Sequence, residues 1–314
     1  MIDNLLSVEE RELKCYDYFH TNCIENREQL RETLKKTPIN GVRIGFIEDI
    51  FSDFLFKKKA AEKKREELKQ TTKYHQTFVL SDMHIPFQDD DTLRNVFDCI
   101  VDNQPKNIVL LGDILDCYSI SRFLRSPDRY RNLQDEINIF YKMMRDLKKH
   151  LPRTDIHYVL GNHENRLAKL VKENDGLFGL KALEPRQVFR LDELGIEYHQ
   201  TKVILDNFIY YHGDVVRKDS AYSAKAEFYD HQMRSGMSGH THRAGSYYHT
   251  YAQETRFWLE NGCLCKIDPE YINDPDKANW QHCINVIDSY EGINQGTQIV
   301  IQDHSFAYGG KIYK

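Results

Sequence analysis

Short apolar runs that end in polar clusters constrain the fold of this 314-residue chain more than any other feature. The runs are rich in β-branched, leucine and aromatic side chains, a composition typical of buried β-strands. They occupy residues 77–80, 107–111, 156–160, 203–205, 208–211 and 298–301. We therefore predict strands at these positions.

Helical segments separate the early strands. Residues 91–103 and 133–150 have helical character, so the order is strand, helix, strand, helix, strand, which is typical of α/β folds. Beyond residue 200 the predicted strands alternate with loops instead. We therefore predict an α/β fold, a layered β-sandwich flanked by helices, with sheets that are partly mixed or antiparallel.

The first part of the chain has a different composition. From Ser7 to about Glu67 it is rich in helix formers and charged residues, so we predict a small helical N-terminal region over 1–72 and a larger domain over 73–314. Residues 57–73 hold eight Lys or Arg against three Glu. This basic segment is either a solvated helix or linker face, or an arm that contacts nucleic acid or a partner.

The overall composition excludes some classes of protein. A formal net charge of −5 argues against a protein that coats nucleic acid through bulk charge. No apolar run approaches the roughly 18 residues that span a bilayer, and the N-terminus lacks the pattern of a secretory signal. The seven cysteines form no Cys-x-x-Cys pair. We expect a cytoplasmic protein with reduced thiols and no membrane contact.

Five polar clusters follow the predicted strands or nearby loops. In chain order they are Asp82-Met-His84, Gly112-Asp113-Ile-Leu-Asp116, Gly161-Asn162-His163-Glu164, His212-Gly213-Asp214 and Gly239-His240-Thr241-His242. Ligand sites of α/β sheets collect where loops leave the carboxyl ends of the strands. The clusters therefore predict a shared site at that edge.

The donor types in these clusters point to metal ions. Carboxylate oxygen, amide oxygen and imidazole nitrogen together suit Mn, Fe or Zn, and no thiolate is required. In an extended segment Asp82 and His84 point to one side and Met83 to the other, so both can reach one ion. Asp113, with two carboxylate oxygens, is the natural bridge between two ions.

Each cluster alone has an ordinary explanation. A single histidine after a strand is commonly packed and hydrogen-bonded, and Gly-Asn-His-Glu is also compatible with a turn. Five such clusters in one chain, each ending or following an apolar run, make chance an inadequate explanation. We therefore interpret them together as one metal site.

The same residues carry a resemblance to a known family. The chain resembles the calcineurin-like metallophosphoesterases, whose signature is Asp-x-His, Gly-Asp-x-x-Asp, Gly-Asn-His-Asp/Glu, a His often followed by Gly, and Gly-His-x-His. The signature spans Asp82 to His242. Residues 119–123, 260–265 and 279–280 are also similar to a subgroup frequent in bacteriophages and prophages. The resemblance implies a calcineurin-like layered β-sandwich.

The resemblance also implies a two-metal centre. It assigns one ion to Asp82, His84, Asp113 and His242, and the second to Asp113, Asn162, His212 and His240. Mn is the first expectation for both, with Fe, Zn, Ni or Mg as alternatives. Two such ions clamp a phosphate and lower the pKa of a bound water, and the resulting metal-bound hydroxide attacks phosphorus.

Further roles follow from the family pattern. His163 corresponds to the acid that protonates the leaving oxygen, and Asp116 to the carboxylate that orients it. We expect Glu164 to act as a hydrogen-bond acceptor near the ligands rather than as a ligand. Three arginines close to the clusters in sequence are candidates for contact with substrate phosphate, namely Arg122, Arg166 and Arg243.

The substrate class stays open at this stage. The leading hypothesis is hydrolysis of a phosphomonoester or phosphodiester. One alternative is a DNA or RNA nuclease guided by the basic segment, and another is a binding or scaffold protein that keeps the fold without turnover. The chain lacks the Arg-Gly that follows Gly-Asp-x-x-Asp in Ser/Thr protein phosphatases, which argues against that activity.

Overall fold

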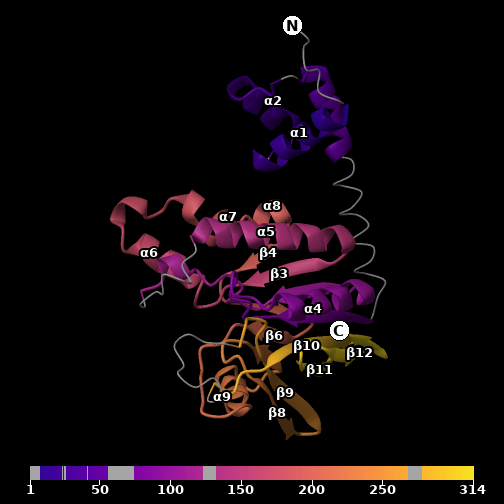
Figure 1. Cartoon of the computed structure of the whole chain (residues 1–314), viewed down its shortest axis with the longest axis vertical. Coiled ribbons are helices and arrows are strands. Elements are labelled where there is room, and N and C mark those ends of the chain that lie inside the picture. The colour runs from indigo at the N-terminus through magenta and orange to yellow at the C-terminus, as the bar shows by residue number, and fades with distance from the viewer. Residues whose placement is uncertain are drawn as a thin grey trace. The chain divides into compact units, whose positions relative to one another are not determined.

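The computed structural model describes residues 8–22, 24, 26–40, 42–55, 74–122, 132–267 and 278–314. The chain divides into two compact units, Met1–Thr72 and Lys73–Lys314. Their elements are labelled in Figure 1. The basic segment over residues 57–73 lies outside the described residues, so both interpretations of it remain predictions.

The described part of the first unit is helical, as predicted. It contains α1 (Val8–Thr21), α2 (Arg27–Lys36) and a further helical stretch over residues 44–55. The side chain of Asn26 caps α2 by accepting the backbone N–H of Glu28 and of Gln29. Apolar side chains from all three stretches, including Phe19, Leu30 and Phe51, form a small core of their own.

The second unit is built on a six-stranded sheet in the order β11-β10-β1-β2-β3-β4. The first four strands in the chain are parallel to one another, whereas β10 and β11 are antiparallel to their neighbours. The strands are β1 (Tyr74–Leu80), β2 (Asn107–Leu110), β3 (Asp155–Val159), β4 (Glu197–His199), β10 (His282–Tyr290) and β11 (Ile293–Ile301).

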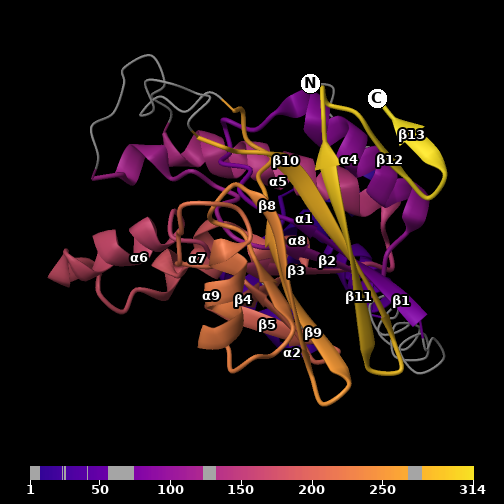
Figure 2. The same ribbon diagram turned by 90° about the horizontal axis from the view of Figure 1, so that it is seen from below.

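A five-stranded mixed sheet in the order β5-β6-β7-β9-β8 packs against the first sheet. Its central strands β6, β7 and β9 are parallel, and β5 and β8 pair antiparallel at the two edges. Its strands are β5 (Lys202–Leu205), β6 (Phe208–Tyr211), β7 (Gly236–Ser238), β8 (Ala244–Tyr251) and β9 (Glu254–Asn261). Figure 2 shows the β8–β9 and β10–β11 hairpins, which meet where β9 packs on β10 and β11.

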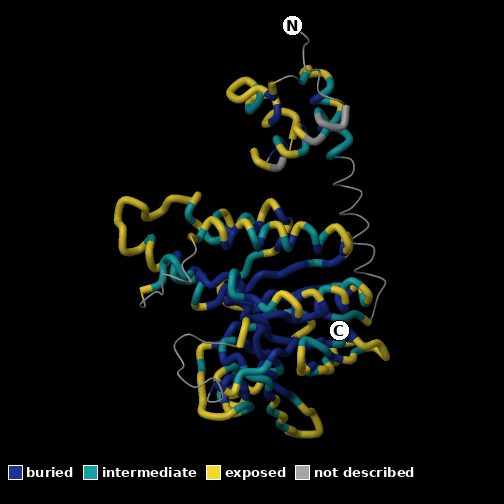
Figure 3. The backbone as a smooth tube through the Cα atoms, viewed as in Figure 1, coloured by how far each residue is buried: buried dark blue, intermediate teal, exposed yellow. Residues whose placement is uncertain are grey.

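Side-chain alternation along the strands separates two apolar layers. Phe78 and Leu80 belong to the layer under the helices α4 (Asp90–Asn103) and α5 (Leu133–His150), whereas Val79 belongs to the layer between the sheets. The central strands of both sheets are accordingly mostly buried, whereas the edge strands β4, β5, β8 and β11 are largely half-buried or exposed, as are the outer sides of the helices (Figure 3). The second sheet is covered on its other face by α9 (Tyr222–Asp230).

Shorter elements complete the second unit. After β3 the chain forms α6 (Asn165–Lys172), the short helices η3 (Asp175–Leu177) and η4 (Lys181–Leu183), α7 (Pro185–Val188) and α8 (Leu191–Leu194). The C-terminal end forms a hairpin of β12 (Phe306–Tyr308) and β13 (Lys311–Tyr313). None of the described helices combines the length and apolarity needed to cross a membrane.

The predicted α/β sandwich with flanking helices is confirmed. All six predicted strands and both predicted helices are present, the helices within one residue of the expected ends. The sequence interpretation missed β4, β7, β8, β9, β10, β12 and β13. These strands are short or carry polar side chains such as Asn285 and Glu260, which are buried here because neighbouring groups hydrogen-bond them.

Phe208 offers a direct test of the packing between the sheets. Its fully buried ring lies 5.1 Å from that of Tyr210 and 5.4 Å from that of Phe257, measured between centroids. Phe208→Ala should lower the free energy of unfolding by about 3–5 kcal/mol. Urea unfolding followed by tryptophan fluorescence reports on this unit alone, because both tryptophans, Trp258 and Trp280, lie in it. Ile204→Ala, at a side chain that is 44% exposed, should cost less than about 1 kcal/mol.

Candidate metal centre

Parallel strands in both sheets deliver the polar clusters to one place. In the first sheet β1, β2 and β3 run in the same direction, and Asp82, Asp113 and Asn162 come just after their carboxyl ends. In the second sheet the parallel strands β6 and β7 end just before His212 and His240. The two sheets therefore contribute ligand candidates from opposite sides of one centre.

The backbone of the ligand loops is left-handed at several non-glycine residues. The φ angles are 51° at Asp82, 49° at His84, 49° at Asp113, 67° at His240 and 58° at His242. The expectation of an extended segment over residues 82–84 is therefore wrong. The two polar side chains still share one side while Met83 is buried in the core, because the loop turns sharply instead of running straight.

Close backbone approach explains two of the glycines in the clusters. A Cβ at Gly161 would collide with the carboxylate of Asp113, and a Cβ at Gly239 would lie 2.5 Å from Asp82 Oδ2. Both positions accept only a residue without a side chain. The glycines thus leave the space in which the carboxylates sit.

One group of donor atoms surrounds the side chain of Asp82. His84 Nε2 lies 3.1 Å from His242 Nε2, and His242 Nε2 lies 3.2 Å from Asp82 Oδ1. Asp82 Oδ1 is fully buried and accepts no hydrogen bond within the described residues. These three side chains are 8% exposed or less.

A second group lies on the other side of Asp113. His212 Nε2 is 3.1 Å from Asn162 Oδ1 and 3.3 Å from Asp113 Oδ2, and His240 joins Asp113 and His212 in one cluster. Asp113 Oδ2 is also 4.0 Å from His84 Nε2 in the first group. This one carboxylate therefore lies between the two groups.

These spacings match the edges of a metal coordination sphere. Donor atoms about 2.1 Å from one ion lie about 3.0 Å apart at a right angle and about 3.4 Å apart at a tetrahedral angle. The four shortest donor–donor distances, 3.1 to 3.3 Å, fall in this interval. Together with the unbonded Asp82 oxygen, they show that the residues present fit divalent cations.

The charges of the centre favour a cation as well. Burial alone would lower the pKa of His212 and of His242, yet Asp113 raises the pKa of His212 to about 10 and Asp82 raises that of His242 to about 10. The buried carboxylates thus create a strongly negative field. The same field attracts divalent ions.

His163 and Asp116 meet at the rim of the centre. His163 Nδ1 lies 2.9 Å from the carbonyl oxygen of Asp116 and 3.4 Å from its Oδ1. Asp116 Oδ2 also lies 3.3 Å from His84 Nδ1, so this carboxylate orients a candidate ligand in addition to His163. The structure therefore gives Asp116 two contacts where the family resemblance implied one.

The three arginines differ in their surroundings. Arg166 reaches the centre, where Nη1 donates to the carbonyl oxygen of Asp116 at 2.8 Å and Nη2 lies 3.0 Å from His163 Nε2. Arg122 forms an ion pair with Glu173, and its side chain is 72% exposed. Arg243 donates to the carbonyl oxygens of residues 217 and 218. Of the three, Arg166 is thus the arginine that contacts His163 and Asp116.

Comparison with known proteins identifies the family. The profile of the calcineurin-like phosphoesterases matches residues 75–262, which is more than half of the chain. The chain belongs to this family. The prediction made from the sequence motifs is confirmed, and the matched residues include all five polar clusters of the phosphoesterase.

One relative comes from a bacteriophage. The gene 54 protein of Mycobacterium phage L5 is 29% identical over 228 residues, which cover 65% of this chain and 84% of the phage protein. Solved structures with a similar arrangement include a single-mutant Vps29 from Entamoeba histolytica (11% identity, 74% of this chain and 96% of that one, TM-score 0.40). Vacuolar protein sorting 29 from Cryptosporidium parvum has 12% identity, with 76% and 94% covered and a TM-score of 0.40.

Glu164 holds the loops of the phosphoesterase centre together. Its carboxylate is fully buried and accepts hydrogen bonds at 2.7–3.1 Å from the hydroxyl of Tyr158 and the backbone N–H groups of Gly161, Asp113, Ile114 and Leu115. The backbone N–H of His163 in turn donates to Asp113 Oδ1. The expected role of Glu164 as an acceptor near the ligands therefore takes a specific form: it fixes the loop of Asp113.

Sequence reasoning missed other residues near the ligands. Buried Glu136 accepts the backbone N–H groups of Cys117 and Tyr118, which directly follow Asp116. Cys265 lies in a cluster with His84 and His242, and the ring of Trp280 is 4.1 Å from that of His242. In the sequence, Cys265 and Trp280 were marked only by their position in segments similar to the phage subgroup. No sequence feature marked Glu136 as a residue near the ligands.

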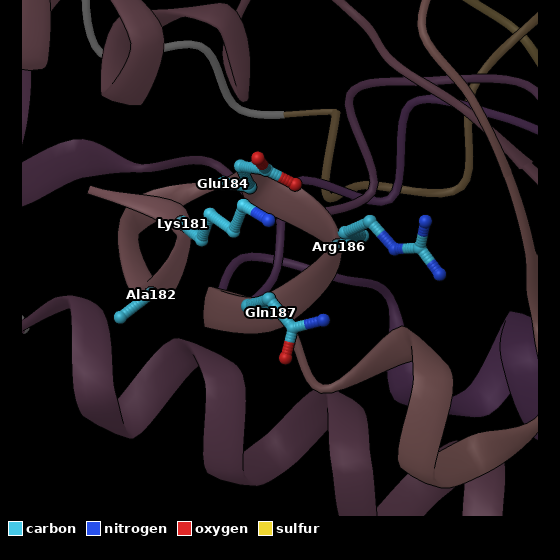
Figure 4. Close-up of a pocket in the computed structure, with 5 residues that line it drawn as sticks. All are labelled: Lys181, Ala182, Glu184, Arg186 and Gln187. Atoms are coloured by element: carbon cyan, nitrogen blue, oxygen red, sulfur yellow. The ribbon is translucent and has the colours of Figure 1, made fainter. Parts of the chain in front are cut away.

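A surface pocket of about 420 Å³ lies elsewhere on the phosphoesterase unit. It is lined by Lys181, Ala182, Glu184, Arg186 and Gln187, from the segment of η4 and α7 (Figure 4). None of these residues is a ligand candidate, and the Arg186 guanidinium is paired with Asp192 at 2.7 Å.

Glu164→Gln tests the acceptor role. Glutamine replaces one acceptor oxygen with an N–H donor, so buried backbone donors lose their partner, and the free energy of unfolding should fall by about 2–5 kcal/mol. Urea unfolding followed by tryptophan fluorescence measures the change. Glu173→Gln, at an exposed ion pair, should change it by less than about 1 kcal/mol. Equal effects of the two substitutions would contradict the role given to Glu164.

Proposed function

We propose that this chain is a two-metal-dependent phosphoesterase that hydrolyses a phosphomonoester or a phosphodiester. The observation that carries the proposal is the position of Asp113 Oδ2, between two groups of nitrogen and oxygen donors whose spacings suit divalent ions. Mn is the first candidate, because the donors are carboxylate, amide and imidazole groups. Fe, Zn, Ni and Mg are further candidates.

Each donor group has a defined task in this proposal. Asp82, His84 and His242 hold one ion, Asn162, His212 and His240 hold the other, and Asp113 is shared by both. Two bound divalent ions clamp a phosphate, lower the pKa of water and stabilise charge on the attacking and leaving oxygens. The amide of Asn162 binds through oxygen alone, which leaves the adjacent His163 free to carry a proton.

Arg166 occupies the hydrogen-bonding position of His163 Nε2. Guanidinium groups only donate, so the 3.0 Å contact from Arg166 makes His163 Nε2 an acceptor and places the ring proton on Nδ1, directed at the carbonyl oxygen of Asp116. To protonate a leaving oxygen from Nε2, His163 must lose this contact and take up a second proton, which Asp113 and Asp116 favour because they raise its pKa against the effect of burial. A substrate phosphate that attracts the Arg166 guanidinium would release Nε2 for that step.

A nuclease activity is a second candidate for the same site. The observation in its favour is the excess of positive charge over residues 57–73, which suits contact with a phosphate backbone. This segment would bind the nucleic acid while the metal centre cleaves it. The two candidates differ in substrate and not in the catalytic residues.

Metal-dependent turnover tests the proposal. Protein treated with chelator should hydrolyse neither p-nitrophenyl phosphate nor bis-p-nitrophenyl phosphate, and adding Mn, Zn, Ni, Fe or Mg should restore activity with at least one ion. Asp113→Asn should remove this activity, because the shared carboxylate is lost. Linear, circular and single-stranded DNA, supplied with the same ions, distinguish a nuclease from a small-substrate hydrolase.

The opposite result is equally clear. Protein that remains folded and binds divalent ions, but turns over no phosphate ester in the panel, would be a binding or scaffold protein. Protein that binds no divalent ion would contradict the metal centre itself. Either outcome would overturn the proposed activity.

His163→Ala tests the acid role. The variant should retain both ions, because His163 is not among the proposed ligands, and should lose about 100-fold to 10,000-fold in kcat on esters with poor leaving groups. Hydrolysis of p-nitrophenyl esters should fall much less, since nitrophenolate leaves without a proton. A variant that hydrolyses an alkyl phosphate at the full rate would exclude His163 as the acid.

A further inference from the structure

A second histidine cluster lies at the edge of the six-stranded sheet. β4 is the edge strand and pairs only with β3, with His157 opposite Glu197 and Val159 opposite His199. Residues two apart on a strand share a face, so Glu197 and His199 point to the same side of β4. His157, Glu197 and His199 thereby come together, and none of them belongs to the metal centre described above.

The donor atoms of this cluster have the spacing of metal ligands. His157 Nδ1 lies 3.2 Å from His199 Nε2 and 3.3 Å from Glu197 Oε2. Both distances fall within the interval of about 3.0–3.4 Å expected for donors on one ion. His199 Nε2 also lies 3.9 Å from Glu197 Oε1, and one donor atom from each residue lies within 4.8 Å of the other two.

Two neighbouring groups compete for the one proton or lone pair of His157 Nδ1. A histidine Nδ1 carries either one proton or one lone pair, so His157 Nδ1 can donate to the carboxylate or to the second imidazole, but not fully to both. With a lone pair there instead, it would face the Glu197 oxygen without a proton between them. A cation placed among the three donors takes a lone pair from each.

The site is partly closed and still accessible. The side chain of His157 is 7% exposed and that of His199 is 18% exposed, whereas that of Glu197 is 65% exposed. An ion can therefore enter from the Glu197 side without any rearrangement of the sheet.

We propose that His157, Glu197 and His199 form a third divalent-cation site, which takes zinc and cross-links the edge strand β4 to β3. Two imidazoles and one carboxylate are a common ligand set for zinc, with water in the fourth position. Such a set of nitrogen and oxygen donors also binds zinc more tightly than manganese. The site is independent of the proposed hydrolysis.

Zinc stoichiometry tests this site in the full-length chain. After equilibrium dialysis against zinc, elemental analysis should find about one equivalent less in His199→Ala and in Glu197→Gln than in the unmodified protein. Glu197→Gln alters an exposed side chain, so it tests the site even if His199→Ala folds poorly. His150→Ala, which removes an exposed imidazole at the end of α5, should bind as much zinc as the unmodified protein.

Two further readouts separate this site from the main centre. Zinc added to protein already loaded with Mn should raise the Tm of the unmodified chain, and this rise should be lost in both variants. Metal binding around Asp113 should stay unchanged in the variants. Equal zinc content in the unmodified protein and both variants, or an equal loss in His150→Ala, would overturn the proposal, whether or not the chain hydrolyses phosphate esters.

Discussion

The structure of the metal centre depends on buried glutamates that bind backbone N–H groups. Glu164 fixes the loop of Asp113, Glu136 fixes the turn after Asp116, and Glu227 and Glu260 do the same for residues 214–215 and for the start of α9. Burial raises the pKa of each of these carboxyl groups, and the backbone donors oppose that shift. The donors lie in loops or in the first turn of α9, where backbone N–H groups lack a regular backbone acceptor, so each glutamate supplies hydrogen bonds that the backbone does not.

This support makes the unusual backbone of the ligand loops tolerable. Left-handed φ angles at Asp82, His84, Asp113, His240 and His242 cost about 1–3 kcal/mol each in an unconstrained chain. The surrounding contacts, including those of Glu164 and the close packing of Gly161 and Gly239, hold the strained loops in place. The left-handed residues direct the ligand side chains toward one site, which a straight strand could not do.

The sequence revealed the strands and clusters that follow general rules, and missed those that depend on tertiary context. Runs such as residues 107–111 are apolar enough to be predicted as strands in any α/β protein. Polar residues follow them because ligand sites form at the carboxyl ends of parallel strands. By contrast, Glu136 occurs in a helix whose other residues are typical of an amphipathic surface, so nothing local distinguishes it from a solvated glutamate. β10 was missed because the burial of Asn285 requires Asn261, which is 24 residues away.

The division of donors between the sheets has a thermodynamic consequence. Asp82, His84, Asp113 and Asn162 follow strands of the first sheet, whereas His212, His240 and His242 follow strands of the second. Divalent ions bound among these donors would therefore link the two sheets. Without cations, the buried carboxylates of Asp82 and Asp113 in the first sheet attract the imidazoles of the second sheet, and they raise the pKa of His212 and of His242 against the effect of burial. Metal binding and sheet packing in this unit are thus one coupled equilibrium, because each lowers the free energy of the other.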